Sequence, residues 1–143
     1  MEYKLYTEIP ESKIMDGILK IHQEIFEDTT LPEKAESKEK ILFFVAVEDG
    51  RVAGYKIGYE VTDDHFYSWY GAVNPEDRGK GIATELMKRQ HTYLKDIGYK
   101  IVSTKTRNKW REMLILNIKH GFDVMETFVD GDGIHRIVLE KQL

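Results

Sequence analysis

The spacing of apolar residues divides the chain into strands, where they alternate with period two, and helices, where they recur every three or four positions. Alternation predicts a first strand over residues 3–9. Helical spacing follows, with Ser12 as the predicted N-cap. The positions with this spacing are Ile14, Ile18, Ile21, Ile25 and Phe26. A short second helix is expected in the polar stretch 28–40, so two helices precede the main run of strands.

Three strands are expected to follow as consecutive hairpins. The uninterrupted apolar run 41–47 is typical of a strand that is buried on both faces. Asp49-Gly50 then favours a tight turn, because both central positions of that turn need positive φ. The partner strand is expected over 52–61 and, after a turn at Asp63-Asp64, a third strand over 65–73.

The second half of the chain alternates helices with strands. A helix is predicted from the region of Gly79 and Gly81 to Gly98, because only glycine adopts the left-handed C-cap without penalty. The remaining predicted elements are a strand at 100–106, a helix carrying Met113, Leu114, Leu116 and Ile118, and two strands at 123–129 and 134–141. The order β-α-(α)-β-β-β-α-β-α-β-β predicts one α/β domain over residues 1–143. Its sheet is expected to be mostly antiparallel around one parallel, right-handed strand–helix–strand unit.

Composition narrows the functions that this domain can have. With 41% hydrophobic and 32% charged residues, the chain can bury a core and does not have a disordered composition. The absence of cysteine excludes a disulfide framework, a thiolate zinc site and a cysteine nucleophile. The five histidines show no ligand spacing, so no metal is expected. No apolar run approaches the roughly 18 residues of a membrane span, and the amino terminus lacks a signal-peptide core, so we expect a cytoplasmic protein.

One short segment departs from the overall net charge of −4, which argues against general nucleic-acid binding. Between positions 78 and 89 there is one acid, Glu85, against four bases: Arg78, Lys80, Lys88 and Arg89. If a helix starts here, its first-turn amides have no internal carbonyl partner and point along the axis at the positive end. These amides belong to Gly79, Lys80, Gly81, Ile82, Ala83 and Thr84. The loop therefore suits a phosphate or diphosphate, and a solvated, lysine-rich helix surface is the alternative.

The loop matches neither of the common nucleotide motifs. The chain contains no G-x-x-x-x-G-K-[ST], and G-x-G-x-x-G fails because Thr84 stands where the third glycine belongs. The string that fits is Arg78-x-x-Gly81-x-Ala83. It lies after a strand and an Asn-Pro turn, and before a helix of about four turns, a strand and a Gly-Phe pair at 121–122. In loop, context and length the sequence resembles the GCN5-related N-acetyltransferases (GNAT), whose acetyl-coenzyme A loop reads [RQ]-x-x-G-x-[GA].

The resemblance implies a GNAT-like sheet with two splayed central strands, helices on both faces, and acetyl-coenzyme A as donor. Loop amides 79–84, beside Arg78, would bind the diphosphate. The pantetheine arm would bond to the strand backbone at Gly71 and Val73, and the Val73 amide would also face the thioester carbonyl. Asn108 and Asn117 occupy the remaining pantetheine positions. Arg107, Lys109 and Arg111 could reach a 3′-phosphate or simply form a solvated helix start.

The catalytic groups follow the family pattern less closely. Relatives place a base near the start of the 65–73 strand, where this chain has Asp63, Asp64 and His65, although two aspartates also suit a plain turn. Relatives carry a tyrosine four residues before the Gly-Phe pair, as the acid for the leaving thiolate. Asn117 stands there instead, and its amide can hydrogen-bond but cannot donate a proton at neutral pH. Either solvent, Tyr67 or Tyr70 protonates the thiolate, or the protein is a poor catalyst.

The acceptor pocket, by the same resemblance, lies between the first helices and the sheet. Its candidate wall residues are His22, Phe26, Tyr67, Trp69 and Tyr70. Alternation places Tyr67 and Trp69 on one face of their strand and Tyr70 on the other. Core packing is the alternative for most of them, and it is the expected role of Phe26, Trp110 and Met113.

The sequence therefore predicts an N-acetyltransferase that moves an acetyl group from acetyl-coenzyme A to a primary amine in a ternary complex. The acceptor would be a small molecule or a peptide. A non-catalytic acyl-coenzyme A sensor or interaction module of the same fold stays open because of Asn117. Nucleic-acid binding through the bases at 78–89 and 105–111 is a weaker rival. Relatives are often dimers, so a homodimer is also open.

Overall fold

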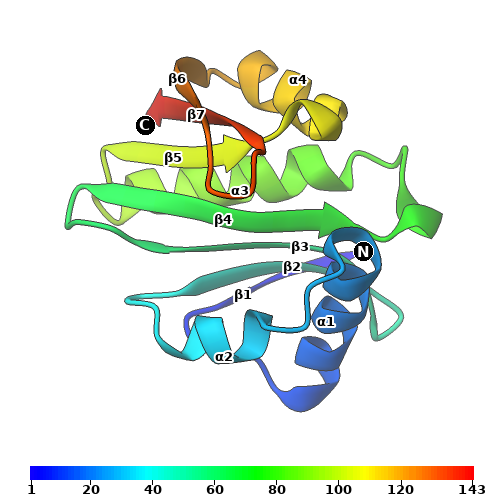
Figure 1. Cartoon of the computed structure of the whole chain (residues 1–143). Coiled ribbons are helices and arrows are strands. Elements are labelled where there is room, and N and C mark those ends of the chain that lie inside the picture. Colours follow the sequence, from blue (N-terminus) through cyan, green and yellow to red (C-terminus); the bar gives the residue numbers. More distant parts are fainter.

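The alternating segments of the sequence assemble into one seven-stranded sheet in the computed structural model, which describes residues 1–143 (Figure 1). The strands are β1 (Glu2–Tyr6), β2 (Leu42–Glu48), β3 (Arg51–Glu60), β4 (His65–Val73), β5 (Ile101–Thr106), β6 (Asp123–Val129) and β7 (His135–Gln142). Their order across the sheet is β1-β2-β3-β4-β5-β7-β6. Every neighbouring pair is antiparallel except β4 and β5. The predicted fold class is confirmed.

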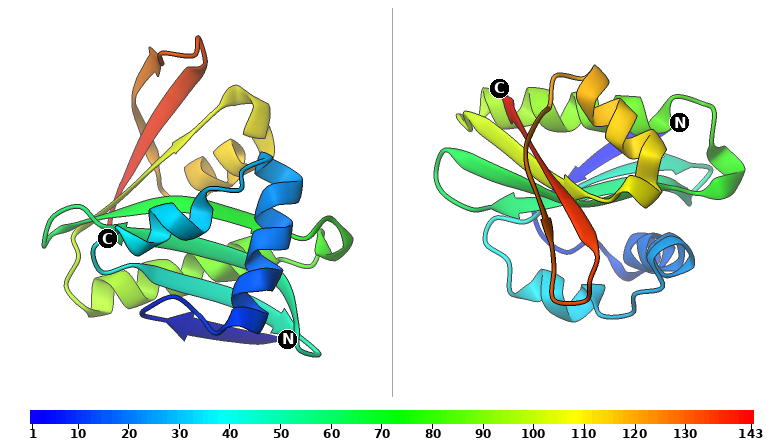
Figure 2. Two further views of the ribbon diagram at one scale, coloured as in Figure 1. Left: turned by 60° about the horizontal axis from the view of Figure 1, so that its bottom comes forward. Right: turned by 45° about the horizontal axis from the view of Figure 1, so that its top comes forward.

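Helices cover both faces of the sheet. They are α1 (Ser12–Phe26), α2 (Leu31–Glu36), α3 (Ile82–Asp96) and α4 (Arg111–Lys119), with short 3-10 turns at Pro75–Asp77 and Asn108–Trp110. The first two lie on one face, and α3 and α4 lie on the other (Figure 2, right). Strand β2 contributes side chains to the cores on both faces of the sheet: Phe43 packs in the core under α1, and Phe44 packs in the core under α3. The prediction of a strand buried on both faces is confirmed.

The parallel pair at the centre of the sheet is short. β4 and β5 are in register from His65 opposite Ile101 to Ser68 opposite Thr104, where the Thr104 hydroxyl donates to the Ser68 carbonyl at 2.9 Å. Beyond this point β5 pairs only with β7, while β4 continues to Val73. Figure 2 (left) shows β5, in yellow, diverging from β4, in green. The central strands therefore splay, and a gap opens beside the second half of β4.

Several sequence-based details differ from the structure. The first strand ends at Tyr6 and not at residue 9, because β1 is an edge strand that pairs with β2 only from Glu2 to Tyr6. The N-cap of α1 is Glu11, which has extended dihedral angles, and Ser12 is already helical.

The predicted core roles of Trp110 and Met113 are also wrong. Both side chains are only half-buried, because Trp110 lies in the 3-10 turn that follows β5 and α4 buries fully only Asn117.

Candidate functional site

The loop between β4 and α3 leaves its backbone groups exposed. Asn74 follows β4, and its side-chain oxygen accepts from the Glu76 amide at 3.1 Å, which starts the 3-10 turn. The chain then passes through Gly79 (φ 81°) and Gly81 (φ 77°), and Gly81 is the N-cap of α3. These left-handed conformations favour glycine, since a side chain there meets its own carbonyl. The predicted start of the helix is confirmed.

The amides of this loop have no partner in the chain. The first helical hydrogen bond of α3 runs from the Glu85 amide to the Gly81 carbonyl, at 3.1 Å. None of the amides of residues 79–84 donates to a backbone or side-chain group. No atom lies within 4 Å of where a Cβ would stand at Gly79 or Gly81. Unpaired amides at the positive end of a helix, with open space before them, form a cradle for an anion.

Asp77 fixes the loop from beneath, a role that the sequence did not reveal. Its carboxylate is 1% exposed and accepts from Arg51 of β3 through Nη1 at 2.9 Å and Nη2 at 3.1 Å. Lys80 Nζ donates to the same carboxylate at 3.1 Å. The hydrogen bonds from Arg51, then from Lys80, lower the pKa of Asp77. The ammonium of Lys80 is thus held by Asp77, whereas Arg78 is exposed beside the cradle.

The second half of β4 presents backbone groups to the gap. The Asn74 amide donates to the Ala53 carbonyl of β3 at 2.8 Å. Because amides point alternately to the two sides of a strand, those of Gly71 and Val73 point away from β3 and toward the gap. The structure therefore brings these two predicted positions to the open edge that leads to the cradle.

A β-bulge in β4 changes the predicted orientation of its aromatic residues. Ile57 of β3 is opposite Tyr70, but Gly58 is opposite Ser68, so Trp69 is the extra residue. Alternation predicted that Tyr70 and Trp69 lie on opposite faces of the strand, and this prediction is wrong. Both pack against the α1 side of the sheet, with their rings 5.0 Å apart. The bulge inserts one residue and so shifts the alternation by one position.

Six half-buried aromatic side chains gather on the α1 side, and we call them the aromatic surface. They are Phe26, Tyr59, Tyr67, Trp69, Tyr70 and Trp110. Neighbouring rings in this set lie 5.0–5.5 Å apart. Phe26 is not buried as a core residue would be, because its ring lies between those of Tyr70 and Trp110. The structure thus brings four of the five predicted acceptor residues onto one surface.

The fifth predicted acceptor residue, His22, lies behind this surface in a buried chain of hydrogen bonds. Its side chain is fully buried, with Nε2 at 2.9 Å from Asp28 Oδ2 and Nδ1 at 2.6 Å from the Tyr55 hydroxyl. Burial lowers the pKa of His22, so the neutral ring donates from Nε2 to Asp28 and accepts from Tyr55. Burial alone would raise the pKa of Asp28, but hydrogen bonds from Thr30 and His22 outweigh it and lower the pKa to about 2. These hydrogen bonds hold the side chains of Tyr55 and His22 in place next to Tyr70.

The candidate bases lie at the other end of β4. Asp63 and Asp64 are exposed in the turn before the strand, and the Asp64 carbonyl accepts from the amides of residues 100 and 101. His65 Nε2 shares a 2.6 Å hydrogen bond with the Ser103 hydroxyl. From His65 to the bulge at Trp69 is roughly 13 Å along the strand. The structure therefore does not bring these three residues together with the cradle.

The two predicted asparagines lie on the segments that follow β5. Asn117 is 4% exposed on α4, and its carbonyl accepts from the amides of His120 and Phe122. Asn108 stands in the turn after β5 and lines a cavity of about 250 Å³. Because β4 and β5 are parallel, the end of β5 and the cradle lie at the same end of the sheet. The other lining residues are Arg107, Lys109, Gly133, Ile134 and His135, and we call this the basic cavity.

Lys56, His91 and Lys141 form a buried basic cluster on the α3 side of the sheet, which was not predicted. Burial lowers the pKa of Lys56, on β3, to about 8. Burial, with the charges of Lys141 and Lys56, lowers the pKa of His91 to about 3, and Lys141 Nζ donates to His91 Nδ1 at 3.0 Å. Neither polar atom of the Gln90 side chain has a partner, and neither does His91 Nε2. No sequence signal joins these residues, because they come from β3, α3 and β7.

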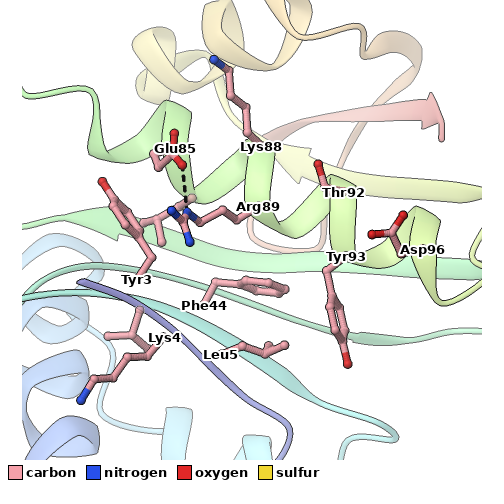
Figure 3. Close-up of a pocket in the computed structure, with 12 residues that line it drawn as sticks. Tyr3, Lys4, Leu5, Phe44, Glu85, Lys88, Arg89, Thr92, Tyr93 and Asp96 are labelled. Carbon is pink, nitrogen blue, oxygen red and sulfur yellow. Dashed lines mark hydrogen bonds and ion pairs between the residues drawn. The ribbon is translucent and has the colours of Figure 1, made fainter. Parts of the chain in front are cut away.

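A larger groove of about 410 Å³ lies between β1 and α3 (Figure 3). Arg89 lies over the ring of Tyr3, 4.6 Å from its centre, and donates from Nε to Glu85 at 2.8 Å. The charge of Arg89 is therefore already paired with Glu85 and the ring of Tyr3. In the strand order β1 is separated from the gap by β2, β3 and β4, so the groove is not part of the candidate site.

A family model described as "Acetyltransferase (GNAT) family" matches residues 11–122. No curated protein matches the sequence. None of the helices is both long and apolar enough to cross a membrane, and no three potential metal ligands cluster.

Solved structures share the fold along nearly the whole chain. An aminoglycoside 6′-acetyltransferase type Ii superposes with a TM-score of 0.85 at 13% identity, covering 99% of this chain and 97% of that one. The ribosomal-protein-S18-alanine N-acetyltransferase from Escherichia coli gives 0.81 at 18% identity, with coverages of 99% and 94%. A GNAT family acetyltransferase from Elizabethkingia anophelis, with acetyl-CoA bound, gives 0.78 at 17% identity, with coverages of 99% and 98%.

Proposed function

The chain belongs to the GNAT acetyltransferase family, and we propose that it transfers the acetyl group of acetyl-coenzyme A to a primary amine within a ternary complex. The observation that carries the proposal is the open cradle. Six successive amides, 79–84, have no partner, and two glycines with positive φ leave the space before them free. A diphosphate is the part of the donor that such a cradle suits, because it offers several charged acceptor oxygens to aligned amides.

The rest of the donor would follow the open edge of β4. The amides of Gly71 and Val73 point into the gap. There they can donate hydrogen bonds to the pantetheine arm, which would accept them in the way that a neighbouring strand does. The Val73 amide would also donate to the carbonyl oxygen of the thioester, on which negative charge develops during transfer. Asn108 and Asn117, on the segments that follow β5, would add side-chain hydrogen bonds to the arm.

The acceptor would approach from the aromatic surface, on the α1 side of the gap. The neutral amine nitrogen forms the new amide bond, the thioester C–S bond breaks, and the amine loses a proton to a base. The three candidate bases, Asp63, Asp64 and His65, lie at the end of β4 away from the cradle, so each would take the proton only through water. The hydrogen bond between His65 and Ser103 orients the His65 ring. Solvent, Tyr67 or Tyr70 would protonate the leaving thiolate, and burial raises the pKa of Tyr67 to about 12.

Amine-dependent thiol release tests the proposal. The purified chain is incubated with acetyl-coenzyme A and a panel of amino acids, polyamines, aminoglycosides and peptides. Thiol release is followed by absorbance, and mass spectrometry identifies the acetylated product. We expect release that depends on at least one amine, together with a product heavier by one acetyl group. Donor hydrolysis without an acetylated amine would contradict the proposal.

A non-catalytic acyl-coenzyme A sensor is the second candidate, and Asn117 is the observation that favours it. The position that carries an acidic tyrosine in many relatives holds a buried amide here. A sensor would bind acetyl-coenzyme A in calorimetry and show no turnover over the whole amine panel. An enzyme would show both.

The Asn117→Ala variant is expected to raise the dissociation constant of acetyl-coenzyme A about 10-fold, because a buried hydrogen-bonding amide is lost. The pH profile of kcat/KM should keep its shape, since an amide does not titrate. Calorimetry and steady-state rates between pH 6 and about 10 measure the two effects. Ile118→Ala is the control, because Ile118 is 51% exposed on the same helix. Loss of the basic limb in Asn117→Ala alone would refute this role.

A further inference from the structure

The basic cavity holds charged groups that the proposed transfer does not use. Three of its six lining residues, Arg107, Lys109 and His135, carry basic side chains, and no carboxylate lines it. Neither Arg107 nor Lys109 forms an ion pair, although other bases of the chain do so. Two uncompensated charges at one cavity produce a positive potential that attracts an anionic group.

The turn between β6 and β7 holds the other wall of the cavity in place. Asp130 accepts from the amides of Asp132 at 2.9 Å and Ile134 at 3.0 Å. Its second oxygen accepts from Arg136 Nε at 2.8 Å, so this carboxylate is already engaged. The turn therefore places residues 133–135 beside the end of β5. Its Asp130 carboxylate is engaged by Arg136, and neither Asp130 nor the exposed Asp132 lines the cavity.

The cavity adjoins the aromatic surface through consecutive residues. Trp110 follows the cavity residue Lys109, whose Nζ lies 4.9 Å from the centre of the Trp110 ring. Trp110 in turn packs on Phe26, with the two rings 5.4 Å apart. A small molecule whose body lies on Phe26 and Trp110 would therefore have the basic cavity within reach.

Two further lysines make the aromatic surface itself positive. Lys38 Nζ lies 4.7 Å from the ring centre of Tyr59 and 5.0 Å from that of Trp69. Lys105 Nζ lies 5.8 Å from the ring centre of Tyr67. Asp28, the carboxylate behind this surface, is held by His22 and Thr30. A polycationic acceptor would meet these charges unfavourably, whereas an anionic one is attracted.

We propose that the acceptor is a small amine that also carries a carboxylate, with its apolar body on the aromatic surface and its carboxylate in the basic cavity. This inference rests on the proposed acetyl transfer and names the class of its acceptor. Arg107 can bind a carboxylate through two parallel N–H groups, and Lys109 contributes a point charge. Aromatic amino acids have both required parts.

Matched pairs of amines test the inference. Each pair shares a body and differs only in the carboxylate: phenylalanine with phenethylamine, tryptophan with tryptamine, and each amino acid with its amide. We expect the carboxylate member to have the higher kcat/KM by about 10-fold or more, through a lower KM, because a charge-assisted contact is present in one member only. Polyamines, an aminoglycoside and lysine peptides complete the panel.

Two variants locate the carboxylate. Arg107→Gln and Lys109→Gln should each raise the KM of the amino acid about 10-fold and leave that of the matched carboxylate-free amine unchanged. Lys95→Gln is the control, because it removes one charge from an exposed position at the end of α3. Circular dichroism checks that each variant is folded.

The 3′-phosphate of the donor is a rival occupant of the cavity. The variants are therefore also measured with acetyl-dephospho-coenzyme A, which lacks that phosphate. If the cavity holds the acceptor, the rise in amino acid KM persists with this donor. If instead the KM of acetyl-coenzyme A rises and the effect disappears with the dephospho donor, the cavity serves the donor and the inference is wrong.

The remaining outcomes separate this inference from the proposed function. Preferred turnover of amines, amides or peptides that lack a free carboxylate would overturn the inference and leave the acetyl transfer standing. Absence of turnover with every amine, despite binding of acetyl-coenzyme A, would overturn both.

Discussion

A valine in place of Gly81 is expected to lower the affinity for acetyl-coenzyme A by at least about 100-fold while the chain stays folded. Gly81 is the N-cap of α3, with φ at 77° and empty space where a Cβ would stand. A branched side chain there would occupy the place of the bound diphosphate. It would also pull the backbone toward negative φ and misalign the amides that follow. Loss of two charge-assisted hydrogen bonds, at roughly 1.5–3 kcal/mol each, accounts for the expected factor.

Gly98→Val is the matched control for this experiment. Gly98 also has positive φ (104°) and nothing within 4 Å of its Cβ position, but it lies beyond the other end of α3. Both variants therefore carry a similar backbone strain, about 1–2 kcal/mol, and only one of them alters the cradle. Calorimetry measures the affinity, and thermal unfolding measures the strain. Equal affinities for Gly81→Val and the unmodified chain would show that the diphosphate is held elsewhere.

The cradle could be predicted from the sequence because its signals are local. Gly79, Gly81 and the apolar period that begins at Ile82 lie within a few residues of one another. Unpaired amides at the first turn are a property of every helix, so their position follows once the start of the helix is known. The same locality explains why β2, a continuous apolar run, was correctly predicted to be buried on both faces.

The features that could not be predicted depend on contacts between distant segments. The bulge at Trp69 is a mismatch in length between β4 and β3, which no alternation within β4 reveals, so the predicted face of Tyr70 was wrong. The chain of Asp28, His22 and Tyr55 joins residues up to 33 positions apart. Arg107 and His135 form one cavity only because β5 and β7 pair.

The buried basic cluster joins the residues that lie farthest apart in the sequence. Its members lie on β3, α3 and β7, and each looks like an ordinary surface base in the sequence. A lysine in a strand usually marks the solvent face, yet the side chain of Lys56 is 7% exposed. Its Cγ and Nζ lie 3.5 and 3.7 Å from the Cβ position of Gly71, so a charged group lies beside the proposed path of the donor. Perturbed ionisable groups of this kind concentrate at functional sites, where stability is reduced.

The Lys56→Met variant is expected to be more stable than the unmodified chain at pH 7, by roughly 3–4 kcal/mol. Burial lowers the pKa of Lys56 from 10.5 to about 8 in the folded state. The difference, about 2.5 pKa units at about 1.4 kcal/mol each, is the free energy that the charged form loses on folding. Methionine has a similar length and no charge, so it fills the same space without that penalty. Thermal unfolding should show a rise in Tm of roughly 10 °C.

The pH dependence identifies the cause. The pKa of Lys56 is lower in the folded than in the unfolded chain, so below about pH 8 both states are protonated and the full penalty is present. From pH 8 to 10.5 the unfolded chain binds more protons, and the stability of the unmodified chain rises relative to that of the variant. The difference between them should therefore shrink across this window. Urea unfolding at several pH values measures it, and taking the difference cancels the groups that titrate in both proteins.

Lys20→Met supplies the comparison for the loss of a charge alone, because Lys20 is exposed on α1. It should change the free energy of unfolding by less than about 0.5 kcal/mol and show no dependence on pH between 8 and about 10. If Lys56→Met were less stable than the unmodified chain at pH 7, the ammonium of Lys56 would have to be compensated by a partner. If it were more stable but the difference did not shrink above pH 8, the gain would come from packing and not from removal of a buried charge.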